Sequence, residues 1–367
     1  MTKLRGALSQ IQGRYERDER SPFDDGWGAG DEGEAEGGAN PPPLPTQVTA
    51  ERARSIIARN DSPDIPFDQS VNPYRGCEHG CIYCYARPSH AYLELSPGLD
   101  FETKLFAKTN AVELLKAELA KPGYRPSPIA FGTNTDCYQP IERSQRLMRG
   151  LIEVLAECEH PLTIVTKSAL IERDIDLLAP MAKKRLVKAF VSVTTLDHRL
   201  ARALEPRAAS PSRRIAAILA LAAAGIPCGV MVAPLIPALT DASLEAVLEE
   251  AAGAGATMAG WILLRLPNEV RPLFKEWLAA HRPERAEHVI SVIRQSRGGR
   301  ENDPRFGSRM TGSGNFVDLV GRRFELACRR LGLNREEDPM ASRGGLDRSR
   351  FRPPPPAPAA GPQMTLF

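Results

Sequence analysis

The chain has 367 residues, of which 42% are hydrophobic, and its formal net charge at pH 7 is only +3. This length allows one large domain with tails or two modest ones, and the hydrophobic content supports a real core. Because the net charge is so small, the total charge does not indicate a class of partner. The distribution of charge along the chain is the more informative property.

Cysteine usage and hydropathy indicate the compartment. Seven cysteines, an odd number, fit a reducing cytosol, where thiolates bind metal rather than form disulfides. Residues Met1–Gly6 lack the apolar core of a signal peptide. The uncharged run Ile215–Leu239 is interrupted by Gly225 and three prolines, and a helix followed by a buried strand explains it better than a membrane span. The sequence therefore predicts a cytoplasmic protein without membrane helices.

Both ends of the chain have the composition of unfolded segments. Residues 1–20 are polar and predict at most a short helix, and residues 21–46 are rich in Gly, Pro, Asp and Glu. Such a segment cannot bury enough apolar surface to become ordered, so 1–47 is expected to be mostly disordered. The region 334–367 is charged and then rich in Pro and Ala, which predicts a second disordered tail.

Between the tails, strand and helix patterns alternate. The predicted strands are Ser70–Gly76, Ile129–Thr133, Leu162–Thr166, Ala189–Thr194, Pro227–Ala233 and Gly260–Leu264, with a further extended piece at Asp100–Lys108. The predicted helices are Asn110–Ala120, Ser144–Cys158, Arg173–Lys183, Ser212–Ala224, Asp241–Ala254 and a helical stretch from Pro272.

This rhythm predicts the α/β class and six parallel βα units in a partial TIM-like barrel over 48–270, followed by a basic helical extension over 271–333. A doubly wound open sheet is the alternative. No G-x-G-x-x-G follows a strand, which counts against a dinucleotide fold.

Cys77, Cys81 and Cys84 stand at C-x-x-x-C-x-x-C spacing, the main chemical motif of the chain. A four-cysteine zinc site or an ordinary cubane needs four ligands, and the next cysteine is Cys137. Three ligands imply a 4Fe–4S cluster with one iron left open for a substrate or cosubstrate. A zinc site completed by a histidine within or after the loop, His79 or His90, is the competing interpretation.

The spacing, with Tyr83 just before the third cysteine, resembles the signature of the radical S-adenosylmethionine (SAM) superfamily. The resemblance implies that the open iron chelates the amino and carboxylate groups of SAM. It also implies a one-electron donor of the flavodoxin or ferredoxin type.

The predicted strand ends are unusually polar, and ligands of parallel βα barrels bind there. The candidate SAM-binding residues are Tyr83, Gly132, Thr133, Asn134, Lys167, Ser192 and Thr194. Acceptors at Gly132–Asn134 suit the ammonium group, and Lys167 suits the carboxylate. Ser192 and Thr194 suit the ribose, and backbone near Tyr83 and Val232–Pro234 can flank the adenine. For each residue the alternative is ordinary turn chemistry.

Longer segments narrow the resemblance. Asn72–Cys77, Gly132–Pro140 and Thr166–Ser168 look like the SAM enzymes grouped as DNA-repair-photolyase-like, the relatives of spore photoproduct lyase. Leu204–Arg207 and Arg305–Arg309 resemble a bacterial branch of that group whose function is unassigned. Over roughly 48–333 the resemblance implies a partial barrel, a 4Fe–4S cluster, SAM, and reductive cleavage to a 5′-deoxyadenosyl radical.

One departure concerns the substrate. Spore photoproduct lyase carries a cysteine near its second strand end that donates a hydrogen atom to the substrate radical. The matching stretch here is Gly132–Asp136, with Cys137 just beyond it. Cys137 is therefore the candidate catalytic residue, with a buried packing role as the alternative. The thymine-dimer substrate does not carry over.

Three other segments suggest ligands or partners. Residues 271–330 hold 13 Lys/Arg against 7 Asp/Glu, and Arg305 and Arg309 are candidates for phosphate contacts or for mere surface. Glu205 and Arg207 are expected in a loop on the barrel rim. They are candidates either for binding substrate or SAM or for an ion pair that fixes the loop. The last five residues, Gln363–Phe367, look like the peptide by which bacterial DNA-processing proteins hold the sliding clamp. The leading hypothesis is a radical SAM enzyme, with nucleic acid as a candidate substrate. A non-catalytic metal-loop protein that docks on nucleic acid is the alternative.

Overall fold

The computed structural model describes residues 5–16, 44–335, 337–338, 340 and 345–355. The disorder expected for most of 21–46 and the clamp-like peptide Gln363–Phe367 concern residues outside these ranges.

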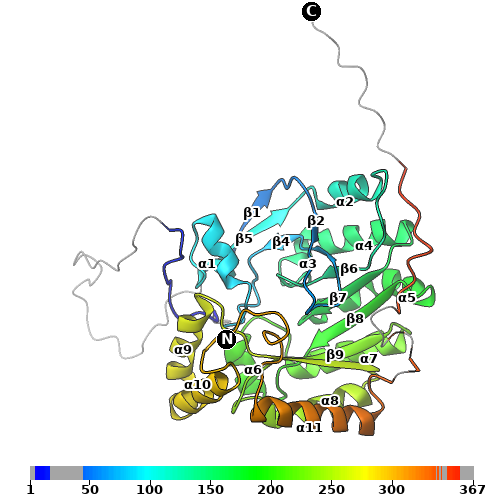
Figure 1. Ribbon diagram of the computed structural model, residues 1–367. Helices are drawn as coiled ribbons and strands as arrows, with labels where there is room; N and C mark the ends of the chain where they lie inside the picture. Colours follow the sequence, from blue (N-terminus) through cyan, green and yellow to red (C-terminus); the bar gives the residue numbers. More distant parts are fainter. Residues whose placement is uncertain (1–4, 17–43, 336, 339, 341–344, 356–367) are drawn as a thin grey trace, which may run out of the picture.

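A seven-stranded sheet forms the centre of the molecule (Figure 1). Its strands are β2 (Ile57–Arg59), β3 (Gln69–Val71), β6 (Ile129–Phe131), β7 (Leu162–Thr166), β8 (Val187–Ser192), β9 (Cys228–Leu235) and β10 (Met258–Leu263). The order is β10-β9-β8-β7-β6-β3-β2, and every neighbouring pair is parallel except β2 and β3.

The six parallel strands follow one another across the sheet in chain order. A doubly wound sheet would reverse its strand order at a switch point, and this sheet does not. The prediction of six βα units in a partial barrel is confirmed, and the doubly wound alternative is wrong.

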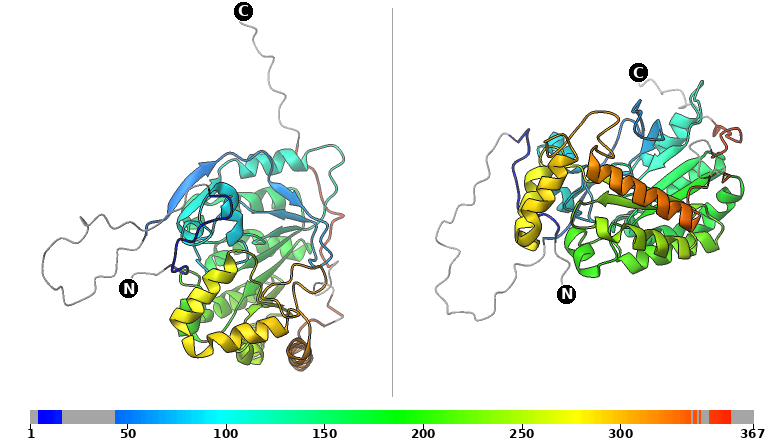
Figure 2. Two further views of the ribbon diagram at one scale, coloured as in Figure 1. Left: turned by 60° about the vertical axis from the view of Figure 1, so that its left-hand side comes forward. Right: turned by 60° about the horizontal axis from the view of Figure 1, so that its bottom comes forward.

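Helices cover the sheet, and three more helices follow its last strand in the chain. They are α2 (Ala111–Leu119), α3 (Glu142–Gln145), α4 (Leu147–Glu157), α5 (Ile175–Lys183), α6 (His198–Leu204), α7 (Pro211–Ala223), α8 (Leu244–Gly253), α9 (Val270–His281), α10 (Ala286–Gln295) and α11 (Asn315–Leu331). The last three fall almost entirely within 271–333, where the sequence predicts a basic helical extension. Figures 1 and 2 show α11 lying beside α8, where Arg323 pairs with Glu245 at 2.6 Å.

A small second sheet has the order β1-β5-β4, with β1 at Gln47–Glu51, β5 at Lys104–Lys108 and β4 at Tyr74–Arg75. The extended piece expected over Asp100–Lys108 is wrong in its first half, which is a short helix, α1 (Asp100–Thr103). Local side-chain bonds favour this turn, because the hydroxyl of Thr103 donates to the carbonyl of Leu99 at 2.8 Å.

The short helix allowed for residues 1–20 is not present in the described part, 5–16, which contains only turns and irregular backbone. The physical reason is a distant carboxylate. Glu102 accepts the backbone N–H groups of Gly6 and Ala7 at 2.8 Å each, and these groups are then not available to a helix.

Part of the carboxyl-terminal tail also packs on the body of the protein. Within 345–355, the ring of Phe351 lies 5.2 Å from that of His160 and 5.4 Å from that of Tyr124. The N–H of Arg352 donates to the carbonyl of Cys158 at 2.8 Å. These residues are ordered by aromatic contacts that a composition-based prediction of disorder does not consider.

None of the helices in the described ranges is both long enough and apolar enough to cross a bilayer.

Candidate active site

The cysteine loop, Cys77–Cys84, follows β4 and is fixed by backbone hydrogen bonds. The N–H of its first cysteine donates to the carbonyl of Phe101 at 2.9 Å, and the N–H of Ile82 donates to the carbonyl of Leu204 at 3.0 Å. Gly80 has a φ of +67°, a conformation that favours glycine, and it lets the chain turn back between the cysteines. The loop is therefore held by segments far away in the sequence.

A buried ion pair supports the loop. The side chains of Arg87 and Glu102 are fully buried and in contact. The guanidinium of Arg87 also donates to the carbonyls of Gly80 (3.2 Å) and Cys81 (3.0 Å). A buried charge is stable only when it is paired and hydrogen-bonded, so this pair favours one arrangement of the loop backbone.

The amino-terminal segment 5–16 lies against the same loop. Its contact is fixed by Glu102, which binds the backbone of Gly6 and Ala7. A Cβ atom added to Gly6 would lie only 1.6 Å from the carbonyl oxygen of Gly80, so only glycine fits at this point. The loop is thus covered by residues that the sequence assigned to a mostly disordered segment.

The three cysteine side chains influence one another. Burial raises the pKa of Cys81 to about 12, Glu205 and Cys84 add to the shift, and Lys167 opposes it. Burial also raises the pKa of Cys77, with contributions from the other two thiols. Protons on such thiols are displaced when a metal binds, because the thiolate is the metal ligand.

No three His, Cys, Asp or Glu side chains among the described residues are arranged around a single metal ion. In an iron–sulfur cluster each cysteine binds a different iron, so its thiolates need not converge on one ion. The two histidines of the zinc interpretation have other contacts. Nδ1 of His79 lies 3.4 Å from the carboxylate of Asp136, and Nε2 of His90 lies 2.9 Å from the carbonyl of Lys104.

Three of the predicted SAM-binding residues lie close together at the strand ends. Nζ of Lys167, just after β7, is 5.8 Å from the centre of the Tyr83 ring. The hydroxyl of Tyr83 lies 3.3 Å from that of Thr194, which follows β8. A cation, a phenol and a hydroxyl therefore meet beside the cysteine loop.

Glu205 ties this group to the barrel. Its carboxylate accepts hydrogen bonds from Tyr83, from Thr194 at 2.8 Å, and from Arg214, all of them buried. Burial would raise the pKa of Glu205, but Arg214 and Lys167 outweigh burial and lower it to about 2. Glu205 is thus an anionic anchor for the hydroxyls of Tyr83 and Thr194.

Helix caps place the rim loop that carries Glu205. The carboxylate of Asp197 caps α6 by accepting from the N–H of Arg199 at 2.8 Å, and Ser210 caps α7. In the loop between them, the guanidinium of Arg207 lies 2.5 Å from Glu78. Both charged residues of the rim loop are therefore in ion pairs, as one of the two sequence interpretations has it.

Asp136 orients the backbone around Lys167. Its carboxylate accepts from the N–H of Lys167 and from the hydroxyl of Thr166, both at 2.7 Å. Burial would raise the pKa of Asp136, but His79 and these hydrogen bonds lower it to about 2. Asp136 was not among the candidate residues predicted from the sequence. The one signal for it in the sequence is its position, two residues after the candidate Asn134.

Gln139, in the same segment after β6, is bonded to the cysteine loop and to the residue before it. Its side-chain oxygen accepts from the N–H of Glu78 at 2.8 Å, and its amide donates to the carbonyl of Gly76 at 3.1 Å. Gln139 is fully buried, so both bonds are shielded from water. The sequence analysis missed this positioning residue.

The Gly132–Asn134 segment makes mostly turn contacts. Gly132 has a φ of +77°, and an added Cβ would lie 1.9 Å from the carbonyl of Val165. The carbonyl of Thr133 accepts from Tyr85, and the N–H of Asn134 donates to Asn72 at 3.1 Å. Ser192 is buried, and its carbonyl accepts from Arg214 at 3.0 Å.

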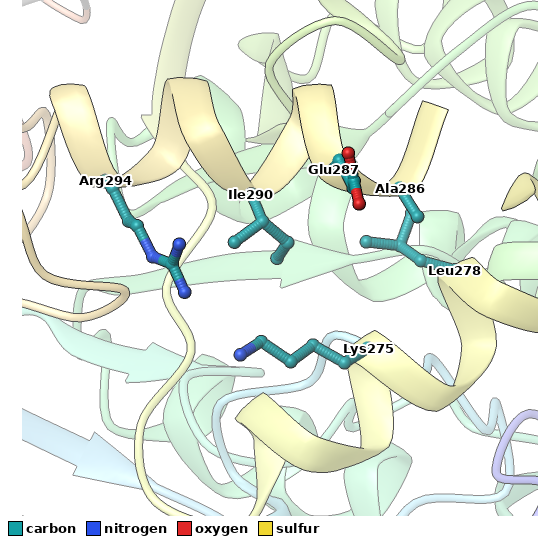
Figure 3. Close-up of a pocket in the computed structure, with 6 residues that line it drawn as sticks. All are labelled: Lys275, Leu278, Ala286, Glu287, Ile290 and Arg294. Atoms are coloured by element: carbon teal, nitrogen blue, oxygen red, sulfur yellow. The ribbon is translucent and has the colours of Figure 1, made fainter. Parts of the chain in front are cut away.

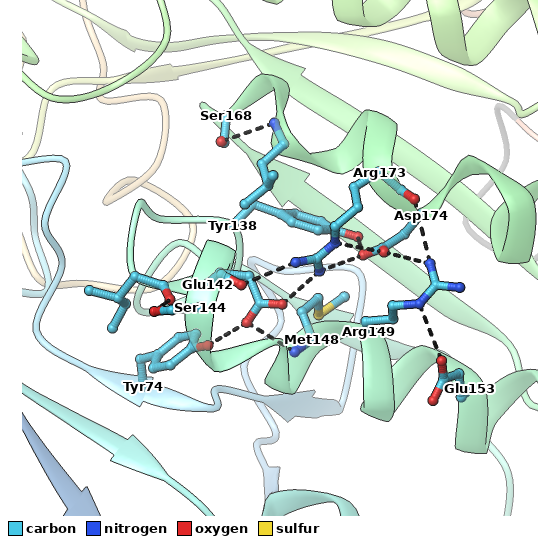
Figure 4. Close-up of polar contacts among 12 residues, drawn as sticks. Tyr74, Tyr138, Glu142, Ser144, Met148, Arg149, Glu153, Ser168, Arg173 and Asp174 are labelled. Carbon is cyan, nitrogen blue, oxygen red and sulfur yellow. Dashed lines mark hydrogen bonds and ion pairs between the residues drawn. The ribbon is translucent and has the colours of Figure 1, made fainter.

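Cys137 is fully buried and packs in the main hydrophobic core. Burial raises the pKa of its thiol, so the side chain stays neutral. Beside it, Tyr138 donates to Asp174 at 3.0 Å, and Arg173 bridges Asp174 to the buried Glu142 (Figure 4). This polar network anchors the segment after β6. The hydrogen-donor role of Cys137 stays a prediction.

A second group of side chains lies around Arg265, which follows β10. The guanidinium of Arg265 lies 5.5 Å from the ring centre of Tyr85, which is 47% exposed. Nε of Arg265 is buried and has no hydrogen-bond partner among the described residues. Arg309 pairs with Asp64 and lies 4.5 Å from the ring centre of Phe306, which is 61% exposed.

Comparison with known proteins identifies the family. The family model described as the radical SAM superfamily matches residues 71–251. An uncharacterized protein of Mycobacterium tuberculosis is 44% identical over 233 residues, which are 63% of this chain and 68% of that protein. The chain belongs to the radical SAM superfamily. It is a radical SAM enzyme, and the cofactors of this superfamily are a 4Fe–4S cluster and SAM.

Further matches agree with this fold. An uncharacterized protein of Methanocaldococcus jannaschii is 28% identical over 171 residues, which are 47% of this chain and 61% of that protein. The structure of spore photoproduct lyase complexed with dinucleoside spore photoproduct superposes with a TM-score of 0.55 at 15% identity, covering 78% of this chain and 80% of that one. At this identity the superposition shows a shared radical SAM fold.

Proposed function

We propose that this radical SAM enzyme holds its cluster on Cys77, Cys81 and Cys84 and acts on a nucleic-acid substrate. The observation that carries the first part is the position of Lys167. Its ammonium lies over the ring of Tyr83. Burial raises the pKa of the Cys81 and Cys84 thiols, and the charge of Lys167 opposes this rise. When bound, the cofactors of this superfamily supply the 5′-deoxyadenosyl radical that abstracts hydrogen.

The chain's own residues bind and orient in this proposal. Lys167 gives a charge-assisted hydrogen bond to the carboxylate of SAM. Thr194 offers a hydroxyl to the ribose, and Tyr83 offers its backbone to the adenine. The Glu205–Arg214 pair fixes Tyr83 and Thr194 from below, because both donate to its carboxylate. Binding and orientation are the protein's share of cofactor chemistry.

The direct test is anaerobic reconstitution with iron and sulfide. The protein should turn brown, carry about four irons per chain, and form 5′-deoxyadenosine from SAM and dithionite. A colourless, iron-free protein after reconstitution would reject the cluster on this loop.

Replacement of Lys167 tests SAM binding by itself. Lys167→Ala should keep the iron but weaken SAM binding by about 2 kcal/mol, the scale for a hydrogen bond to a charged group. Isothermal titration of SAM into the reconstituted protein measures the change. Lys183→Ala, an exposed lysine at the end of α5, is the matched control and should bind SAM as the unmodified protein does.

The substrate class is proposed from the side chains around Arg265. Arg265 makes no ion pair among the described residues, so its charge is available for a phosphate. The exposed rings of Tyr85 and Phe306 offer surfaces for bases. Arg305 and Arg309, the phosphate candidates from the sequence, already pair with Asp303 and Asp64, which makes Arg265 the stronger candidate. The related fold of spore photoproduct lyase, solved with a dinucleoside, supports the same class.

Replacement of Arg265 tests this assignment. Arg265→Gln should weaken binding of a single-stranded DNA or RNA oligonucleotide and reduce the slope of log affinity against log salt by about 1, the loss of one phosphate contact. Fluorescence anisotropy at several salt concentrations gives both values. Arg322→Gln, at an exposed arginine of α11, removes the same charge and should leave the slope unchanged. Absence of any binding at low salt would contradict a nucleic-acid substrate.

The clamp interaction of Gln363–Phe367 is a second proposed partner. Its support is the sequence alone, with glutamine first and Leu366-Phe367 last. Together with a nucleic-acid substrate, this interaction would place the enzyme at DNA. A cytoplasmic location is proposed separately, from the cysteine usage of the chain.

A further inference from the structure

Helices α9 and α10 lie side by side and leave a surface cleft between them (Figure 3). This cleft measures about 420 Å³, and a second one of about 470 Å³ adjoins it, since Lys275 and Arg294 line both. The floor of the first is apolar, formed by Leu278, Ala286 and Ile290. The pair of hollows, called the basic cleft below, thus combines an apolar centre with charged edges.

Positive charge is in excess around the basic cleft. Arg271, Lys275, Arg294 and Arg300 line it. The carboxylate of Glu301 is nearly buried and forms ion pairs with three of them. The distances are 2.7 Å to Lys275, 2.5 Å to Arg294 and 3.8 Å to Arg271.

The remaining charges of the cleft do not restore neutrality. Arg300 forms no ion pair among the described residues, and Glu287 is the other acidic residue of the lining. Lys275 and Arg294 remain 41% and 53% exposed. The surface therefore presents Arg300, unpaired among the described residues, and two exposed cations that share one carboxylate, and a partner's carboxylates can reach all three.

A short bonded route joins the basic cleft to the cysteine loop. Trp277, the neighbour of Leu278 in α9, is fully buried, and its Nε1 donates to the carbonyl of Ala203 at 3.0 Å. The next residue, Leu204, accepts the N–H of Ile82 from the cysteine loop at 3.0 Å.

Apolar packing follows the same course. Cys81 and Ile82 belong to one buried cluster with Trp277, Leu278 and Ile290. The floor of the basic cleft and the cysteine loop are therefore parts of a single packed body.

We propose that the basic cleft is the docking site of an acidic one-electron carrier protein that reduces the cluster. The inference rests on the proposed function, which requires one electron per SAM cleavage. The carrier is oxidised by one electron and the cluster is reduced by one, with no bond made or broken in the transfer. An apolar centre with a charged rim is the anatomy of a protein interface, whereas a phosphodiester backbone needs no apolar floor. This favours a protein over a nucleic acid at this surface.

The test compares two double variants of the full, reconstituted chain. Lys275→Gln with Arg294→Gln removes two charges from the basic cleft. Arg322→Gln with Arg329→Gln removes two from exposed positions on α11 and is the control. An acidic flavodoxin and an acidic ferredoxin are the probes, titrated calorimetrically at low salt. The cleft variant should bind the better probe at least tenfold more weakly, with the control within twofold of the unmodified protein. Carbodiimide cross-links should map to Lys275.

Two further arms separate this inference from the proposed function. With dithionite as reductant, both variants should form 5′-deoxyadenosine at the unmodified rate, and with the reduced carrier only the cleft variant should be slow. Failure of the dithionite reaction in the unmodified protein would reject the proposed function, while the binding titration would still report on docking. Equal carrier affinity in both variants, no carrier binding at low salt, or a loss confined to a labelled single-stranded DNA probe would each overturn the docking proposal.

Discussion

Alanine at Cys77, Cys81 or Cys84 is expected to abolish both iron binding and SAM cleavage, the largest effect of any single change in this chain. In the proposed site each cysteine supplies one of three protein ligands, and a cluster that loses one has no nearby cysteine as replacement. Iron content after anaerobic reconstitution and the formation of 5′-deoxyadenosine measure the two losses.

The remaining cysteines provide matched controls. Cys137, Cys158, Cys228 and Cys328 are all buried, and alanine at each should leave the iron content unchanged. Burial alone would then not explain the loss in the loop variants. If Cys137→Ala lost as much iron as Cys84→Ala, the three-ligand assignment would be wrong.

Glu102→Ala is expected to lower the free energy of unfolding by about 3–5 kcal/mol, the range for removing one partner of a buried ion pair. The variant leaves the guanidinium of Arg87 fully buried without a carboxylate and frees the backbone of Gly6 and Ala7. Chemical denaturation of the iron-free protein, followed by circular dichroism, measures the change without interference from the cofactor.

An exposed pair serves as the comparison. Glu249 contacts Arg330 with side chains 49% and 61% exposed, and Glu249→Ala should cost less than about 1 kcal/mol because solvent screens such pairs. Similar losses in the two variants would mean that the Arg87–Glu102 pair does not stabilise the loop as its burial indicates.

Much of the barrel could be predicted because its signals are local. The burial of β8 alternates along Val187–Phe190, and α7 begins at a Ser-Pro cap, both readable from neighbouring residues. The place of the cysteine loop and of Lys167 was predictable for a related reason, since one is a motif and the other directly follows a strand.

The residues that hold the loop in place were not predictable in this way. Glu102, Gln139 and Arg214 act through partners that lie elsewhere in the chain, and a sequence shows their charge or polarity without showing their burial. The same limit explains the amino-terminal segment. Its polar composition predicts disorder, and only the distant carboxylate of Glu102 reverses that expectation.

The contact between Gly6 and Gly80 has a practical consequence. Trimming the chain to the start of the predicted barrel, at Val48, would remove the residues that cover one side of the cysteine loop. Dioxygen would then reach this side of an oxidation-prone cofactor more easily. A shortened protein would be expected to lose its colour in air sooner than the full chain, although every cysteine remained in place.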